Sequence, residues 1–371
     1  MSKYWNSRIK GLSPYIPGEQ PRERKFIKLN TNENPYPPSP KVIEAIQYVL
    51  AQGGGGNAYT GARLRLYPDP ACTELREAIA MMYQVKPAQV FAGNGSDEVL
   101  AFAFGAFFEN GGRPILFPDI TYTFYPVYSS LWALESKNPP LTDDFSIRTE
   151  DYRVKSGGVI LANPNAPTGR ALSAEDVMSI VQYEENGDRN FVIVDEAYNA
   201  FGTESVVKHI GKNPNLLTIH TLSKSASLAG LRVGFAIGNE DLIEALCRIR
   251  DSFNSYTLGA LAQAGATAAM SDTAYYSGIN KKIIATRERV SAELSGMGFE
   301  VIPSKTNFIF ARYPEKSGAE TFTALRERGI LVRRFNLPRI SDFLRISIGT
   351  NDDMDRFLDS CRDIININEN H

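Results

Sequence analysis

The chain has 371 residues, 43% of them hydrophobic, which is enough to bury a sizeable core and favours a main domain with a smaller companion. Its 40 lysine and arginine residues nearly balance 42 aspartate and glutamate residues, giving a formal charge of -2. This balance gives no reason to expect nucleic acid or an anionic membrane surface as a partner. An anion-binding site must therefore come from the local placement of a few cations.

The chain is poor in residues that bind metals or form disulfides. Cys72, Cys247 and Cys361 lie far apart with no CxxC pair, which predicts reduced thiols and a cytoplasmic location. The three histidines have no metal-ligand spacing, so we expect no metal site and no Ser-His-Asp triad. The N-terminus lacks the apolar core of a signal peptide, and no apolar run reaches ~18 residues, so no membrane span is predicted.

The first part of the chain is irregular. Residues 1–40 are rich in proline and asparagine, which predicts an extended arm with turns. A helical pattern covers 41–51, and four glycines follow at Gly53–Gly56. We interpret this glycine stretch as a mobile surface loop, because a phosphate-binding P-loop would continue with Lys-Ser or Lys-Thr.

From about residue 75 to 270, helical patterns alternate with short apolar runs. The helical patterns are ELREAIAMMY, DEVLAFAFGAFF and SAEDVMSIVQYEE, and the apolar runs are QVFAG, RPILFP, GGVILAN, FVIVDE, LLTIHTL and GFAIG. This alternation is typical of an α/β fold, in which helices cover both faces of a mostly parallel sheet.

The last part of the chain predicts a smaller α+β unit. A long helix is expected over 281–298, followed by strand patterns, a helix over 318–328 and a final helix over 351–364. We therefore divide the chain into an N-terminal arm (1–40) that joins the small domain, a large domain (41–275) and a small domain (276–371).

Polar residues follow several predicted strands, where sheets of this kind bind ligands. The segment Gly93–Glu98 combines a tight glycine turn with a helix start, whose free N–H groups suit an anion. Ordinary capping by Ser96 explains this segment equally well. The segment Asn163–Gly169 contains two prolines and a glycine, and by itself it predicts only a strand-to-helix loop.

Two charged residues end buried strands. Asp195 follows the apolar run FVIV, where a carboxylate needs a cationic partner or a structural salt bridge. Lys224 follows LLTIHTLS, with small residues around it and Arg232 eight positions later. Desolvation and a neighbouring cation both lower the pKa of a lysine and make its amine nucleophilic.

Together these residues match the needs of pyridoxal phosphate. Its ring nitrogen needs a carboxylate such as Asp195, its phosphate needs N–H groups with serine and arginine, and its reactive carbon needs a lysine amine such as that of Lys224. Tyr122 offers an aromatic face for the ring, although alone it would be interpreted as a core aromatic residue.

The motifs extend over nearly the whole chain and resemble those of fold-type I, class I/II aminotransferases, within them the histidinol-phosphate aminotransferase family. The matching segments are LSPY at 12–15, NENPY at 32–36, YPDP at 67–70, GNGSDE, TYTFY, NPNAPTG, DEAY, TLSK with AGLR, and LRISIG at 344–349. The resemblance implies a two-domain PLP enzyme in which Lys224 forms the Schiff base and moves a proton during catalysis.

The resemblance also implies how the cofactor is held. Asp195 would keep the ring nitrogen protonated, Tyr198 would hydrogen-bond the 3-oxygen of the ring, and Tyr122 would stack on it. Tyr67 would reach the cofactor phosphate of a neighbouring subunit, which implies a homodimer with shared active sites. The phosphate in the same subunit would be bound by Ser96, Asp97, Thr221, Ser223 and Arg232.

One departure concerns the 3-oxygen of the ring. Many relatives carry NPNNPTG, whereas this chain has Ala166 in place of the asparagine before Pro-Thr-Gly. The contact to the 3-oxygen therefore comes from Asn165 or is absent.

The substrate residues also follow from the resemblance. Arg345 would clamp the anionic group of the substrate, because guanidinium suits carboxylate and phosphate alike. Arg333 and Tyr15 would assist it, with Arg334 as an alternative to Arg333. Asn34 is also placed among the substrate-binding residues.

The expected reaction is transamination between L-histidinol phosphate and 2-oxoglutarate, in histidine biosynthesis. The alternatives with the same cofactor are an aromatic or broad-specificity aminotransferase and a threonine-phosphate decarboxylase. A PLP-binding regulator would need an added DNA-binding module, for which the sequence has no basic segment. A nicotinamide-dependent dehydrogenase is disfavoured, because the segment at Gly93 lacks the last glycine of that fingerprint.

Overall fold

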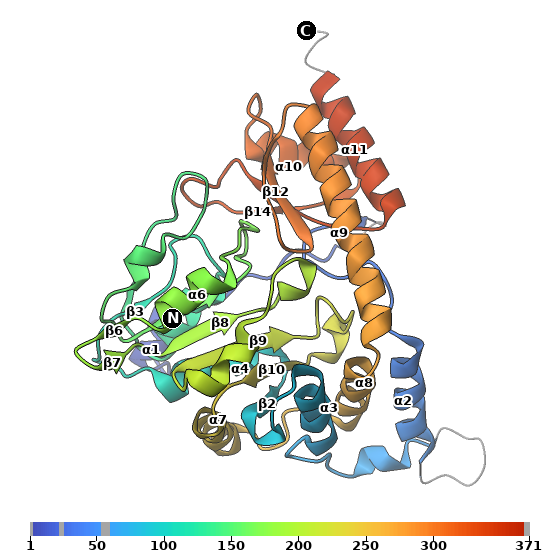
Figure 1. Ribbon diagram of the computed structural model, residues 1–371. Helices are drawn as coiled ribbons and strands as arrows, with labels where there is room; N and C mark the ends of the chain where they lie inside the picture. The colour runs from blue at the N-terminus through green and yellow to red at the C-terminus, as the bar shows by residue number, and fades with distance from the viewer. Residues whose placement is uncertain (1–2, 22–25, 53–59, 367–371) are drawn as a thin grey trace.

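The computed structural model describes residues 3–21, 26–52 and 60–366, so the Gly53–Gly56 stretch lies outside the described residues. Its main feature is a seven-stranded sheet in the order β2-β10-β9-β8-β5-β3-β4, called the large sheet below (Figure 1). The strands are β2 (Val90–Gly93), β10 (Gly234–Ile237), β9 (Leu216–Thr221), β8 (Val192–Asp195), β5 (Gly158–Ala162), β3 (Ile115–Leu116) and β4 (Ser136–Lys137). All neighbouring pairs are parallel except those that β10 makes with β2 and β9, which confirms the prediction of a mostly parallel sheet.

Helices cover both faces of the large sheet, which explains why its strands are apolar throughout rather than alternating. On β8, Val192 and Val194 belong to one apolar cluster and Ile193 belongs to the other. The first cluster includes residues of α3 (Thr73–Tyr83), α6 (Ala174–Val181) and α8 (Ala260–Met270). The second includes residues of α4 (Gly95–Phe107), α5 (Phe124–Leu131) and α7 (Glu240–Phe253).

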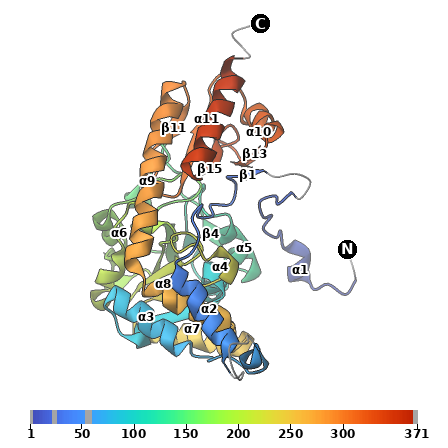
Figure 2. The same cartoon turned by 90° about the vertical axis from the view of Figure 1, so that its right-hand side faces the viewer.

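A second, antiparallel sheet of four strands is called the small sheet. Its order is β11 (Glu300–Ile302), β12 (Phe308–Arg312), β15 (Leu344–Ser347) and β14 (Arg333–Arg334). It packs with α10 (Gly318–Glu327) and α11 (Asn351–Asn366), and α11 runs alongside the long helix α9 (Thr273–Gly296) (Figure 2). In the N-terminal arm, β1 (Ile27–Lys28) pairs in parallel with β13 (Ile330–Leu331).

Helix α9 links the two sheets (Figure 1). Tyr276 and Ile279 in its first turns pack in the core of the large sheet, whereas Ile283, Val290 and Leu294 pack in the core of the small sheet. The predicted domain boundary between residues 275 and 276 therefore falls within one continuous helix, and the division remains a prediction.

Three predicted elements differ from the structure. Helix α6 ends at Val181, because β6 (Glu184–Glu185) and β7 (Asp188–Arg189) form a hairpin around Asn186-Gly187. Both turn residues have positive φ, as a tight Asn-Gly hairpin requires. Helix α9 begins at Thr273 rather than near residue 281. Helix α4 begins at Gly95 with Asn94 at the N-cap position, so the interpretation of Ser96 as the N-cap is wrong.

The remaining described elements are two helices and several 3-10 turns. They are α1 (Ser7–Gly11), α2 (Pro40–Ala51), which packs against α8, and the 3-10 turns η1 (Ala62–Arg65), η2 (Pro87–Gln89), η3 (Thr149–Tyr152), η4 (Asn199–Phe201), η5 (Val206–Lys212) and η6 (Ala229–Leu231). Within the described parts of the chain, no helix is both long and apolar enough to cross a membrane.

Candidate functional site

A cavity of about 290 Å³ lies where the ends of β8 and β9 and the start of α4 meet the small sheet and the N-terminal arm. It brings together residues that the sequence places more than 300 positions apart. The predicted site residues that line it are Tyr15, Ser96, Asp97, Tyr122, Asp195, Tyr198, Thr221, Ser223, Lys224, Arg232, Arg333 and Arg345.

One end of the cavity is shaped for an anion. The first N–H groups of α4 have no partner within their own helix, and the cap residue Asn94 provides no side-chain bond to them. The Arg232 guanidinium donates to Ser223 Oγ (3.4 Å) and to the Asp97 carboxylate (2.9 Å). A Cβ on Gly95 would lie 2.5 Å from this guanidinium, so a side chain there would displace the guanidinium from its present position. Backbone N–H groups, a hydroxyl and a cation therefore converge here.

Lys224 lines the cavity three residues after the end of β9. Its ammonium donates to the Thr31 carbonyl at 3.2 Å, and its own carbonyl accepts from Asn34 Nδ2 at 3.0 Å. Burial, and then the nearby Arg345 guanidinium, lower the pKa of Lys224 to about 8. A substantial fraction of this amine is therefore neutral near physiological pH and able to act as a nucleophile.

Asp195 ends β8 and is 5% exposed. Its carboxylate accepts from the Ala197 N–H (3.1 Å) and the Tyr125 hydroxyl (3.1 Å). Among the described residues no cation pairs with it, which argues against the structural salt bridge considered from the sequence. Burial raises the pKa of Asp195 to about 6, although these two hydrogen bonds act to lower it. Such a carboxylate favours a ligand that brings a positive charge.

The aromatic walls of the cavity are hydrogen-bonded in place. The Tyr122 hydroxyl donates to Asp97 Oδ1 at 2.7 Å, so the carboxylate of Asp97 bridges Tyr122 and Arg232. The Tyr198 hydroxyl accepts from Asn32 Nδ2 at 2.9 Å. Burial raises the pKa of both tyrosines, which keeps both hydroxyls protonated at neutral pH.

The opposite end of the cavity holds two arginines of the small sheet. Arg345 on β15 donates to the Asn30 carbonyl (3.2 Å), and its guanidinium lies 5.4 Å from the rings of Phe308 and Phe335. Its Nε is covered and has no hydrogen-bond partner among the described residues. Arg333 donates to the carbonyls of the arm at Ile16 and Pro17. Neither guanidinium pairs with a carboxylate in the described structure, so both favour an anionic ligand.

Tyr15 lies beside these arginines in the cavity lining, and its ring stacks on Phe124 with the centroids 4.3 Å apart. Arg334, the alternative to Arg333, bonds the Ser341 carbonyl and does not line the cavity.

Three predicted residues lie outside the lining. Both amide hydrogens of Asn165 are used, by the Ile120 carbonyl and by Thr168 Oγ1, so Asn165 braces its loop instead of facing the cavity. Asn34 supports the Lys224 loop, because its side chain bonds the backbone of Lys224. Tyr67 is 81% exposed and stacks on Tyr256 with centroids 4.5 Å apart. For Asn165 and Asn34 the geometry does not support direct ligand contact.

Two of the lining residues that were not predicted from the sequence, Asn32 and Thr31, make polar contacts with predicted site residues. Asn32 has a φ of +55°, and besides Tyr198 it contacts the Ser347 hydroxyl at 3.0 Å. Thr31 supplies the carbonyl that Lys224 binds. The polar residues that follow Leu29 were the signal in the sequence that could have indicated these contacts, because Asn is one of the few residues that adopt positive φ easily.

This set of residues fits pyridoxal phosphate. The N–H groups of α4 with Ser223 and Arg232 suit its phosphate, and the glycine at position 95 keeps that end open. Asp195 supplies the carboxylate that a protonated ring nitrogen needs, and Lys224 supplies a nucleophilic amine. The described residues contain no cluster of three or more His, Cys, Asp or Glu that could hold a metal ion.

Comparisons with known proteins agree with this chemistry. The family model described as aminotransferase class I and II matches residues 24–360. A histidinol-phosphate aminotransferase from Clostridium beijerinckii is 51% identical over 369 residues, covering 100% of this chain and 99% of the relative. A histidinol-phosphate aminotransferase from Bordetella parapertussis is 54% identical over 353 residues, covering 94% and 95%.

Solved structures share the fold. The crystal structure of histidinol-phosphate aminotransferase from Sinorhizobium meliloti, in complex with pyridoxal-5′-phosphate, has a TM-score of 0.85 at 22% identity. The alignment covers 99% of this chain and 98% of that one. A putative aminotransferase from Burkholderia pseudomallei has a TM-score of 0.77 at 26% identity, covering 93% and 100%.

Proposed function

Because the chain belongs to the aminotransferase class I and II family, we propose that it uses pyridoxal phosphate to transfer the amino group of L-histidinol phosphate to 2-oxoglutarate. The products are imidazole acetol phosphate and L-glutamate. This donor is supported by the relatives named histidinol-phosphate aminotransferase, which are 51% and 54% identical to this chain over nearly its whole length.

The observation that carries the proposal is the Arg345 guanidinium, which shares the cavity with Lys224 and has no carboxylate partner in the described structure. An unpaired, partly buried cation is costly unless a ligand supplies the opposite charge. Arg333 adds a second cation nearby, which suits a donor that carries a phosphate and an acceptor that carries two carboxylates.

When bound, pyridoxal phosphate supplies an aldehyde for the amino group and a ring that accepts the electron pair left as the Cα–H bond breaks. Lys224 would hold the cofactor through Nζ and would afterwards hold and move the proton at that atom, a role that suits its lowered pKa. Asp195 would hold a proton on the ring nitrogen, while Arg345 would orient the anionic end of the substrate. Tyr122 lines the cavity and would stack on the ring, with its orientation fixed by its hydrogen bond to Asp97.

A homodimer with shared active sites is the second part of the proposal. Tyr67 and Tyr256 form an exposed aromatic pair, with Leu64 and Phe253 also exposed nearby in the sequence. Exposed aromatic side chains of this kind are enriched at protein interfaces.

The free cysteines agree with the expected cytoplasmic location.

A donor panel with 2-oxoglutarate tests the proposed reaction. Histidinol phosphate should give a kcat/KM at least about tenfold above phenylalanine, tyrosine and threonine phosphate, because only it combines the ring with a phosphate that the arginines bind. Equal or faster turnover of phenylalanine or tyrosine would establish an aromatic aminotransferase instead. Release of carbon dioxide from threonine phosphate would establish a decarboxylase.

A further inference from the structure

A small apolar cluster joins the two sheets beside the cavity, and we call it the intersheet cluster. It packs residues of the large-sheet segment 120–145 against residues of the small sheet and of the loop between β14 and β15. Its members are Ile120, Leu141, Phe145, Ile302, Phe310, Ile340 and Phe343. Because it is separate from the main cores of both sheets, it is a distinct contact between them.

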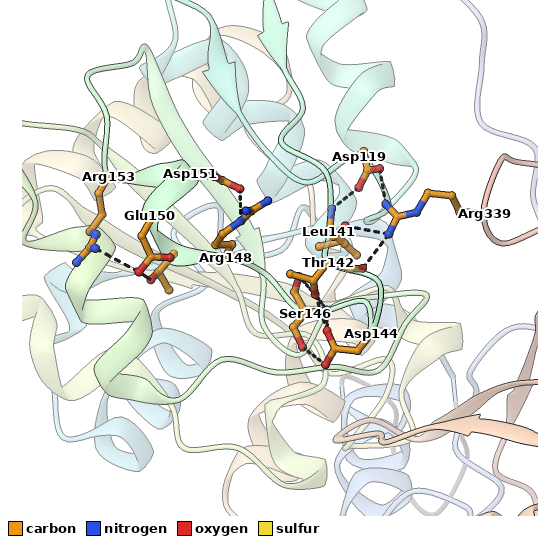
Figure 3. Close-up of polar contacts among 11 residues, drawn as sticks. Asp119, Leu141, Thr142, Asp144, Ser146, Arg148, Glu150, Asp151, Arg153 and Arg339 are labelled. Carbon is orange, nitrogen blue, oxygen red and sulfur yellow. Dashed lines mark hydrogen bonds and ion pairs between the residues drawn. The ribbon is translucent and has the colours of Figure 1, made fainter.

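The turn at 141–146 delivers Phe145 to this cluster. Phe145 has a φ of +61°, a strained conformation for a bulky residue that persists only when its surroundings enforce it. The Asp144 carboxylate enforces it by accepting from the hydroxyls of Thr142 (2.5 Å) and Ser146 (2.9 Å) (Figure 3). The turn is therefore a rigid element rather than a loose loop.

This turn is tied to the cofactor side of the cavity. Arg170 donates to the Asp144 carboxylate at 2.7 Å and to its carbonyl at 2.9 Å. Arg170 directly follows the Asn163–Gly169 loop, in which Pro164 and Ala166 line the cavity. The turn and the cofactor side of the cavity are therefore coupled by a two-point contact.

The same turn is tied to the small sheet by Arg339. This residue lies in the loop between β14 and β15, and its guanidinium reaches across to the Asp119 carboxylate (3.1 Å) (Figure 3). It also donates to the carbonyls of Leu141 (2.9 Å) and Thr142 (2.8 Å), and lies 5.7 Å from the Phe145 ring centroid. One side chain thus holds the loop to the turn by two hydrogen bonds and to Asp119 by a third.

The loop and the cluster also contact the substrate arginine. On the small sheet, Phe310 of β12 is the register partner of Arg345 on β15. Phe310 stacks on Phe343 at 4.8 Å and meets Phe145 edge-on at 5.9 Å. Phe335, which begins the loop that Arg339 fastens, lies against the Arg345 guanidinium. A shift of the loop would therefore move the surroundings of Arg345.

We propose that Arg339 is a positioning residue that sets where Arg345 lies relative to the cofactor-binding side of the cavity. By fastening the 335–343 loop to the 141–146 turn, it fixes the separation between Lys224 and the anion clamp, and so the length of substrate that fits. This inference rests on the proposed function only in taking Arg345 as the anion-binding residue.

The first test uses the protein without cofactor or substrate. In Arg339→Ala, amide hydrogen exchange in 335–343 should be at least about fivefold faster than in the unsubstituted protein, because the loop loses its fastening. Alanine is as strained as arginine at the φ of +68° found here, so the backbone cost is matched. Arg153→Ala, which removes an ion pair to Glu150 within one exposed segment, should leave this exchange unchanged (Figure 3).

The second test measures binding and kinetics of the cofactor-loaded protein. Arg339→Ala should raise both the Kd of succinate and the KM of the acceptor by about tenfold, with kcat changed less than about threefold, because the clamp binds substrate before the chemical step. Arg339→Lys, which keeps a cation, should recover part of the loss. Succinate binding does not depend on the identity of the amino donor, so a wrong donor assignment would leave this result intact.

Two results would overturn the inference. Unchanged exchange in 335–343 would show that Arg339 does not hold the loop. Faster exchange with an unchanged Kd of succinate and an unchanged KM of the acceptor would show that the loop does not position Arg345.

Discussion

The two ends of the cavity are built in different ways. At the cofactor end, Ser96, Asp195 and Lys224 each lie at or within three residues of the end of a strand of the large sheet, which places them. At the substrate end, Tyr15, Arg333 and Arg345 come from the N-terminal arm and the small sheet. The cofactor end is thus determined mainly by one sheet, whereas the substrate end depends on how separate parts of the chain pack together.

The charges differ as well. The Arg232 cation at the cofactor end is already paired with Asp97, so this end is partly balanced before any ligand binds. Arg333 and Arg345 at the substrate end are bonded only to carbonyl oxygens among the described residues. We infer that the cofactor end is prearranged for one permanent ligand, while the substrate end stabilises successive anionic substrates.

The largest effect is expected from Lys224→Ala at the cofactor end. Turnover should fall by roughly 10⁴-fold, because both the attachment amine and the proton-transferring group are lost. The visible absorbance of the attached cofactor should disappear. Borohydride reduction should no longer leave the cofactor attached to the protein. The unliganded protein should keep its fold, since the Lys224 ammonium donates a hydrogen bond only to the Thr31 carbonyl among the described residues. Full activity in this variant would refute the cofactor assignment.

At the substrate end, Arg345→Ala should cost about 3 kcal/mol of substrate binding, on the order of 100-fold in kcat/KM, because a partly buried charge pair with the ligand is lost. The KM values of the acceptor and of the donor should both rise in steady-state assays. Cofactor absorbance should be unchanged, which separates the two ends of the cavity. An unchanged KM for both substrates would contradict the role of Arg345 as the anion clamp.

The cofactor end was largely predictable from sequence, and the reason is local. A residue at or just past the carboxyl end of a buried strand must lie at the edge of the sheet where ligands bind, as do Asp195, the last residue of β8, and Lys224, three residues after β9. The alternation of apolar runs and helices likewise predicts the large sheet, because both of its faces are covered. The antiparallel direction of β10 could not be predicted this way, because a strand buried on both faces has the same apolar residue pattern whether it is parallel or antiparallel to its neighbours.

The substrate end is less predictable, because its contacts are long-range. The bond between Asn32 and Tyr198 joins residues 166 positions apart, and no local pattern indicates it. The choice between Arg333 and Arg334 depends on which of two adjacent side chains faces the cavity, and this follows from the pairing of β14 with β15. The family resemblance places Asn165 at the cofactor, whereas its buried amide is used by neighbouring loops.

Acidity gives a third prediction, again at the cofactor end. The pKa of Asp195 in the folded protein is raised to about 6 from an ordinary value of 3.8. The folded protein therefore binds more protons than the unfolded chain between these values, so stability is lost as pH rises through this range. In cofactor-free protein, the free energy of unfolding should therefore fall by about 1 kcal/mol more between about pH 5 and pH 7 than it does in Asp195→Asn. Urea unfolding at several pH values measures the difference.

Pyridoxal phosphate should remove this pH effect, because a cation beside Asp195 favours the charged carboxylate. Comparison with Asp195→Asn also separates this group from Glu196, whose pKa burial raises to about 7. The same pH slope in both proteins would mean that Asp195 is not the titrating group.

The smallest effect on turnover is expected from the adjacent arginines at the substrate end. Arg333→Ala should lower kcat/KM for histidinol phosphate by about tenfold, because Arg333 lines the cavity and adds a second cation for the phosphate. Arg334→Ala is the matched control, since Arg334 bonds the Ser341 carbonyl away from the cavity, and its kcat/KM should change less than about twofold. Steady-state assays with both variants and a non-phosphorylated donor measure the contrast. The loss in Arg333→Ala should be larger for the phosphorylated donor, because only that donor has a second anionic group to lose. Equal losses in the two variants would mean that Arg345 alone binds the anionic groups at the substrate end. The two ends of the cavity would then come from different parts of the chain, but each would use a single arginine to bind its ligand.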